Sequence, residues 1–145
     1  MGIFSKTCEY AVRAVFYIAQ SSQEGRKVGI KEIAEKVKSP EPFLGKILQN
    51  LSKVGLIQST KGPHGGFFID PEGLKKPIAD IVLAIDGEQI FTGCGMGLDY
   101  CSEKNPCPLH HDFKKVRNQL SSMLKKTSIG QFNLQLIKGS VTLYK

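Results

Sequence analysis

The spacing of apolar residues along the chain predicts a mainly helical protein. Between residues 5 and 20, apolar side chains recur every three or four positions, which places them on one face of a helix. The same period returns over residues 30–37, 40–54, 77–86 and 108–127. Ser5 stands where a helix cap would stand, and Ser39 precedes a proline as a cap precedes the first helical residue. Gly55 marks the expected end of the third helix.

Two short strand-like runs, residues 56–60 and 67–70, interrupt the helical pattern and flank the turn KGPHGG, which is dense in Gly and Pro. Three helices followed by such a hairpin have the order of a winged helix-turn-helix. The predicted fold is therefore mainly α, with a small β-hairpin wing and a long C-terminal dimerisation helix. We divide the chain into a winged helix-turn-helix domain at residues 1–76, a short helix and cysteine-rich loop at 77–107, and a dimerisation helix with its tail at 108–145.

The balance of charge indicates a polyanionic partner. The 145 residues include 20 Lys and Arg against 13 Asp and Glu, a net charge of +7, and residues 1–76 hold 12 of the basic and 7 of the acidic side chains. A basic surface of this kind is typical of nucleic-acid binding, although a solvated basic surface is the plainer alternative.

Length and hydropathy fit one ordinary globular domain. No apolar run is long enough to span a membrane, and residues 1–20 lack the apolar stretch of a secretory signal. The expected location is therefore cytoplasmic, with no membrane partner. No Ser/His/Asp arrangement, Walker loop or dinucleotide fingerprint is present in the sequence, so we do not expect an enzyme.

The third predicted helix has the side chains that a DNA-reading helix needs. Between residues 46 and 53 its outer positions are long, polar and free of acids; such side chains read base edges or meet phosphate. The hairpin turn adds a Lys and a His that could reach a minor groove or phosphates. The residues predicted to contact double-stranded DNA are Ser39, Phe43, Lys46, Gln49, Asn50, Lys53, Lys61 and His64.

Cys94, Cys101 and Cys107 fall within 14 residues, in a glycine-rich stretch. In a reducing compartment such a group more often indicates metal or redox chemistry than disulfides. The spacing is not the paired pattern of a zinc ribbon, and thiolates on a flexible loop suit an iron–sulphur cluster. Structural zinc, a thiol switch and inert buried cysteines are the alternatives.

Three cysteines leave one coordination position for another residue. His110 lies about one turn beyond Cys107 if the last helix has begun there. Cys8 and Glu9 of the first helix are alternatives, and a second subunit could supply them. The sequence leaves this choice open, and with it the cluster type, 2Fe–2S or 4Fe–4S.

The long C-terminal helix carries a single apolar seam with steps of 4, 3, 4 and 3 residues, which is heptad spacing. A single seam suits a second helix, whereas packing on the chain's own core is the alternative. We favour a homodimer, because no other element obviously remains to cover the seam. Its residues are Leu109, Phe113, Val116, Leu120 and Met123.

Several stretches resemble the Rrf-type winged-helix regulators of bacteria, whose members include cluster-binding regulators of the IscR and NsrR kind. Residues 5–14 resemble the first helix of that family, and residues 30–34 and 44–57 resemble its helix-turn-helix. The turn KGPHGGF at 61–67 resembles its wing, and the three clustered cysteines with PLH at 108–110 resemble its ligand loop. The resemblance covers about residues 1–127.

This resemblance implies a homodimeric transcription factor, typically a repressor, with an iron–sulphur cluster on the three cysteines. In members with a histidine ligand the matching residue is His110, and in members with an acidic ligand from the partner's first helix it is Glu9. Lys61 matches the basic wing residue that enters a minor groove. Cluster loss, nitrosylation or redox change alters DNA affinity in such members, so nitric oxide or oxygen is the implied signal. A CymR-like regulator that also binds a partner protein is the alternative.

Overall fold

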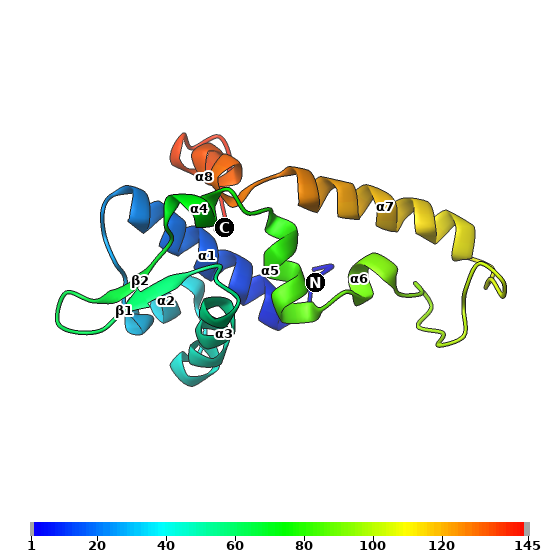
Figure 1. The fold of residues 1–145 in the computed structure, drawn as a ribbon, viewed down its shortest axis with the longest axis horizontal. Helices are drawn as coiled ribbons and strands as arrows, with labels where there is room; N and C mark the ends of the chain where they lie inside the picture. The colour runs from blue at the N-terminus through cyan, green and yellow to red at the C-terminus, as the bar shows by residue number, and fades with distance from the viewer. Residues whose placement is uncertain (1, 144–145) are drawn as a thin grey trace.

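The computed structural model describes residues 2–143 and confirms the mainly α fold with a hairpin wing. Figure 1 shows a body of packed helices and the hairpin, from which one long helix extends together with an irregular loop at its far end. The elements in chain order are α1 (Lys6–Gln23), α2 (Ile30–Val37), α3 (Glu41–Lys53), β1 (Gln58–Thr60), β2 (Gly66–Phe68), α4 (Pro71–Leu74), α5 (Ile78–Asp86), α6 (Gln89–Thr92), α7 (His110–Lys126) and α8 (Ile129–Ile137).

Helix α1 lies at the centre of the body and packs against α2, α3, α5 and α8. Its N-terminus is capped as predicted, because the Ser5 hydroxyl accepts the Cys8 backbone N–H at 3.0 Å. The helix runs to Gln23, beyond the predicted end at residue 20. The reason is tertiary: the Ser22 hydroxyl donates to the Ile18 carbonyl at 2.8 Å and accepts the backbone N–H of Ile69 beyond the hairpin at 2.9 Å.

Helices α2 and α3 form the helix-turn-helix, and α3 buries an apolar face made of Leu44, Ile47, Leu48 and Leu51. Burial of each such side chain contributes about 1.5–3 kcal/mol. The N-cap of α3 is Pro40, one residue later than predicted. Ser39 does not cap the helix, because its backbone N–H bonds to the Ala34 carbonyl at 3.0 Å and its hydroxyl contacts the Pro40 carbonyl at 3.3 Å.

The wing is an antiparallel hairpin in which Gln58 pairs with Phe68 and Thr60 with Gly66. Both strands are shorter than predicted. Val28, ahead of α2, exchanges two backbone hydrogen bonds with Phe67, at 3.0 and 2.8 Å, and so ties the hairpin to the body. Gly66 has φ +142°, and a Cβ there would lie 2.8 Å from the Val28 carbonyl oxygen. Only glycine permits this close approach of the two backbones.

Three helices were not predicted: α4, α6 and α8. Helix α8 begins with a capping box, in which the Ser128 hydroxyl accepts the Gln131 backbone N–H at 3.1 Å and the Gln131 side chain accepts the Ser128 N–H at 3.0 Å. That spacing of Ser and Gln is visible in the sequence and marks a helix start. Helix α6 lies in the part of residues 77–107 that was predicted to be the cysteine-rich loop. Within residues 2–143, every helix is too short or too polar to cross a membrane.

Candidate metal centre and DNA-binding surface

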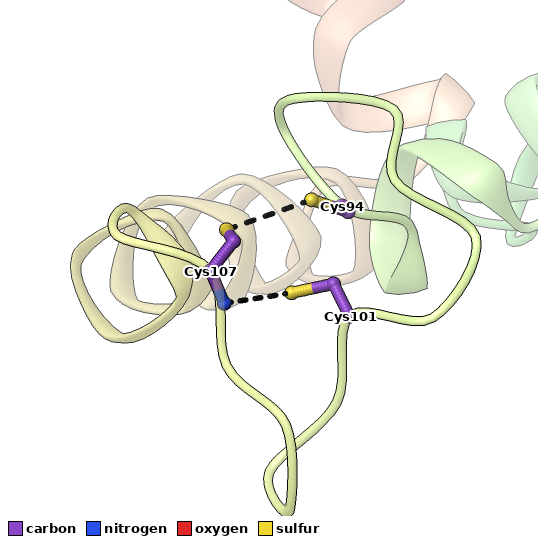
Figure 2. A group of neighbouring side chains, drawn as sticks. All are labelled: Cys94, Cys101 and Cys107. Atoms are coloured by element: carbon purple, nitrogen blue, oxygen red, sulfur yellow. Dashed lines mark hydrogen bonds between the residues drawn. The ribbon is translucent and has the colours of Figure 1, made fainter.

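The three clustered cysteines lie on the segment between α6 and α7, residues 93–109, which we call the cysteine loop (Figure 2). Cys94 stands just after α6, and Cys107 stands three residues before α7. Their sulfurs are 3.7 Å apart. Cys101 points at Cys107, whose backbone N–H donates to the Cys101 sulfur at 3.4 Å. All three sulfurs lie within 4.8 Å of one another, and none is in a disulfide.

The donor set fits a metal that prefers sulfur. Two thiolates on one tetrahedral metal ion with bonds of 2.3 Å stand about 3.8 Å apart, close to the separation of Cys94 and Cys107. Tetrahedral thiolate ligation is shared by structural zinc and by the irons of iron–sulphur clusters. The cysteine loop therefore supplies three converging thiols for a metal centre of either kind.

The electrostatics of the loop favour the metal-binding form of Cys94. The backbone N–H groups of Leu98 and Met96 lower the pKa of Cys94 to about 7, because they stabilise its thiolate. The backbone N–H of Cys107 also lowers the pKa of Cys101, but burial and the neighbouring thiols outweigh it and the net change is upward. Since the thiolate is the form that binds a metal, the loop backbone favours the ligand form of Cys94.

His110, the first residue of α7, is the fourth-ligand candidate that the structure brings to the cysteines. Its Nδ1 lies 3.2 Å from the Cys101 sulfur, and its ring is buried. Its Nε2 lies 3.2 Å from Oε1 of Glu103, which also forms an ion pair with Lys114. Lys114 and His110 together lower the pKa of Glu103 to about 2, since each stabilises the carboxylate. The sequence did not predict Glu103 as part of this site, because no periodic pattern marks a residue in an irregular loop.

Cys8 and Glu9 lie elsewhere. Cys8 is fully buried in the core of α1, and burial raises the pKa of its thiol to about 12. Glu9 pairs with Lys6 at 3.3 Å on the same helix. Within one chain, Cys8 is thus a packed core residue and Glu9 a half-buried carboxylate that pairs with its own helix.

Arg117 of α7 holds the start of the cysteine loop. Its guanidinium donates to the carbonyl of Thr92 at 3.2 Å and to that of Gly93, the residue before Cys94. It also lies over the Phe113 ring, 5.8 Å from the centroid. Helix α7 therefore contacts the start of the loop through Arg117 and the middle of the loop through His110.

The predicted seam of α7 divides into two faces. Phe113 and Leu120 are half-buried: Leu120 packs against the chain's own core, and Phe113 lies against Gly95 of the cysteine loop. Leu109, Val116 and Met123, spaced by seven residues, are 50%, 52% and 55% exposed. Within residues 2–143, no element covers this exposed stripe of three apolar side chains.

Helix α3 and the wing present the predicted DNA-contacting residues in different ways. Lys46, Gln49 and Lys53 are exposed on α3, and Lys61 and His64 are exposed at the tip of the wing.

The other three predicted residues make contacts within the chain. The side-chain amide of Asn50 donates to the Ala84 carbonyl of α5 at 3.0 Å, so it ties α3 to α5. Phe43 is 38% exposed and packs edge-on against Tyr10, with ring centroids 5.9 Å apart. Ser39 is buried.

Known proteins resemble the chain over most of its length. The Rrf2 family, described as "Iron-dependent Transcriptional regulator", matches residues 4–133. A protein of Aquifex aeolicus named as an HTH-type transcriptional regulator is 38% identical over 129 residues, which are 88% of each chain. The HTH-type transcriptional regulator IscR of Photorhabdus laumondii is 28% identical over 120 residues, 83% of this chain and 72% of its own.

Two solved structures share the fold. CymR, the global cysteine regulator of B. subtilis, superposes with a TM-score of 0.74 at 20% identity, over 92% of this chain and 97% of its own. IscR of T. potens superposes with a TM-score of 0.73 at 22% identity, over 98% of this chain and 93% of its own. Sequence and fold agree, and the chain is a transcriptional regulator of the Rrf2 family.

Proposed function

We propose that this regulator binds double-stranded DNA as a homodimer and senses redox state, nitric oxide or iron–sulphur status through a metal centre on its cysteine loop. Cys94, Cys101 and Cys107 would hold an iron–sulphur cluster, and His110 would complete the ligand set. The observation that carries the proposal is the convergence of three free sulfurs within 4.8 Å, with the His110 imidazole beside them. The description of the family as iron-dependent favours iron over zinc.

The DNA-binding surface would consist of α3 and the wing. Lys46, Gln49 and Lys53 are exposed and can reach base edges or phosphates in a major groove. Lys61 and His64 at the wing tip would meet the adjacent backbone or minor groove. Asn50 is exposed beside them, and one hydrogen bond from its side-chain amide to the Ala84 carbonyl ties α3 to α5.

The signal would reach DNA through α7. His110 and Arg117 attach the cysteine loop to this helix, and Leu109, Val116 and Met123 on its exposed stripe would meet the second subunit. A bound metal would hold the loop closed against α7 and thereby fix the arrangement of the two subunits. Because a dimer must match the spacing of two half-sites, loss of the metal would change affinity for the operator. Couplings of this kind are typically about 1–3 kcal/mol.

The proposal is tested by purifying the full chain without oxygen, recording its absorption spectrum, and assaying iron, sulphide and zinc on the same sample. Visible bands with matched iron and sulphide support the cluster. Stoichiometric zinc in a colourless protein overturns it, and a metal-free protein whose cysteines oxidise reversibly would be a thiol switch. DNA binding is measured on loaded and stripped protein, and equal affinity and selectivity would contradict sensing.

Removal of the positive charge at Lys46 or Lys61 is expected to weaken DNA binding about equally across sequences. Each alanine variant should reduce the slope of log affinity against log salt by about 1, because one phosphate contact releases about one counterion. Fluorescence anisotropy over a salt series measures this slope. Lys138→Ala, at the exposed end of α8, is the matched control and should leave the slope unchanged. An unchanged slope in Lys61→Ala would remove the wing from the interface.

A further inference from the structure

We propose that Glu103 is a positioning residue that fixes the tautomer of His110 and directs its Nδ1 toward the metal. This inference rests on the proposed function for the metal itself, but the preference for one imidazole tautomer belongs to the protein alone. Glu103, which lies outside the ligand set, would thus determine which ring nitrogen of His110 binds the metal.

The two ring nitrogens of His110 face different partners. Nδ1 lies 3.2 Å from the sulfur of Cys101, and Nε2 lies 3.2 Å from Oε1 of Glu103. An ionised carboxylate can only accept a hydrogen bond, so Nε2 must carry the proton. In a neutral imidazole the other nitrogen, Nδ1, then has the free lone pair that a metal needs. The nitrogen beside the thiols is therefore the one prepared to bind.

Lys114 keeps the Glu103 carboxylate in this position. It lies one helical turn after His110 on α7, and its ammonium forms an ion pair with the same oxygen of Glu103 that faces the imidazole. The imidazole and the cation thus come from one helix, and the carboxylate bridges them from the loop. The side chain of His110 is only 8% exposed, which leaves its ring little room to turn over.

The same contacts argue against a second metal site made of Glu103, His110 and His111. Ligand atoms of these three residues lie within 4.8 Å of one another. The Lys114 ammonium already pairs with the carboxylate, however, and a positive charge at that place repels a cation. Glu103 therefore serves the cysteine site as an outer partner of its histidine. Outer partners of this kind raise ligand basicity, and their loss typically costs about 10–100-fold in metal affinity.

The tautomer is tested first on the metal-free full chain, by long-range proton–nitrogen NMR of its histidines at alkaline pH. We expect the proton of His110 on Nε2 in the natural protein and a mixture of tautomers in Glu103→Ala. Asp99→Ala, another exposed acid of the cysteine loop, is the control and should leave His110 unchanged. A proton on Nδ1 in the natural protein, or no change in Glu103→Ala, would overturn the inference.

The metal is tested next, in chains reconstituted without oxygen. Histidine labelled with nitrogen-15 at one ring position should show the strong magnetic coupling of a directly bound nitrogen from Nδ1, and only the weak coupling of a remote nitrogen from Nε2. Glu103→Ala should lose iron to a chelator about 10–100-fold faster than the natural chain, and Glu103→Gln, which keeps an acceptor oxygen, should lie between them. The stronger coupling from Nε2, or equal loss rates, would contradict the assignment.

The two arms separate this inference from the function on which it rests. If the natural chain takes up neither iron nor zinc, the proposed metal centre is wrong. The NMR measurement still decides whether Glu103 fixes the tautomer of His110. Because the Glu103 side chain is 58% exposed, its replacement should leave the thermal unfolding midpoint near that of the natural chain.

Discussion

Replacement of Cys101 by serine is expected to lower the apparent affinity for the metal more than about 100-fold, beyond the roughly 10–100-fold cost of losing an outer partner. Protein purified without oxygen should therefore contain much less iron and sulphide. Cys101 is the central donor of the group: its sulfur is 3.2 Å from Nδ1 of His110 and accepts the N–H of Cys107. A serine hydroxyl stays protonated near neutral pH and is a harder donor, so it replaces the thiolate poorly.

Cys8→Ala is the matched control for this substitution. Cys8 is fully buried in the core of α1, so its loss should cost about 1 kcal/mol of stability and leave the metal content unchanged. Metal analysis and the visible spectrum measure the metal content of both variants, and thermal unfolding measures their stability. If Cys101→Ser kept natural levels of iron and sulphide, the proposed ligand set would be wrong. Loss of metal in a folded Cys8→Ala variant would make Cys8 a ligand.

A glutamate at Val116 is expected to convert the proposed dimer into monomers. Val116 lies in the middle of the exposed stripe on α7, between Leu109 and Met123, and half of its side-chain surface is uncovered in one chain. Two-fold symmetry would bring both new carboxylates into the same apolar interface. An unpaired buried charge costs about 3–5 kcal/mol, which corresponds to a loss of roughly 100-fold or more in dimer affinity.

Sedimentation over a range of protein concentrations measures this change. Asn118→Glu is the control, because residue 118 is exposed and lies about 200° around the helix from Val116. The Val116→Glu protein should also bind a single half-site nearly normally while it loses the advantage of a paired operator. A Val116→Glu protein that stays dimeric at the same concentrations would show that this stripe is not the interface.

The sequence by itself determined the elements whose signals are local. The 3.6-residue period of apolar side chains predicted α1, α2, α3, α5 and α7, and the Gly-rich turn predicted the wing. The spacing of the cysteines and His110 along the chain predicted one metal centre. These features could be predicted because a period, a cap or a run of donors acts within a few residues along the chain.

Tertiary structure decided the features that depend on residues far apart in the sequence. Glu103 joins the cysteines and His110 only because the loop folds against α7, and the bond from Asn50 to the Ala84 carbonyl forms only because α3 packs against α5. The same packing divided one heptad seam into a half-buried face, with Phe113 and Leu120, and an exposed face, with Val116. Helical periodicity shows which side chains share a face, but only the neighbouring elements determine which part of that face is covered.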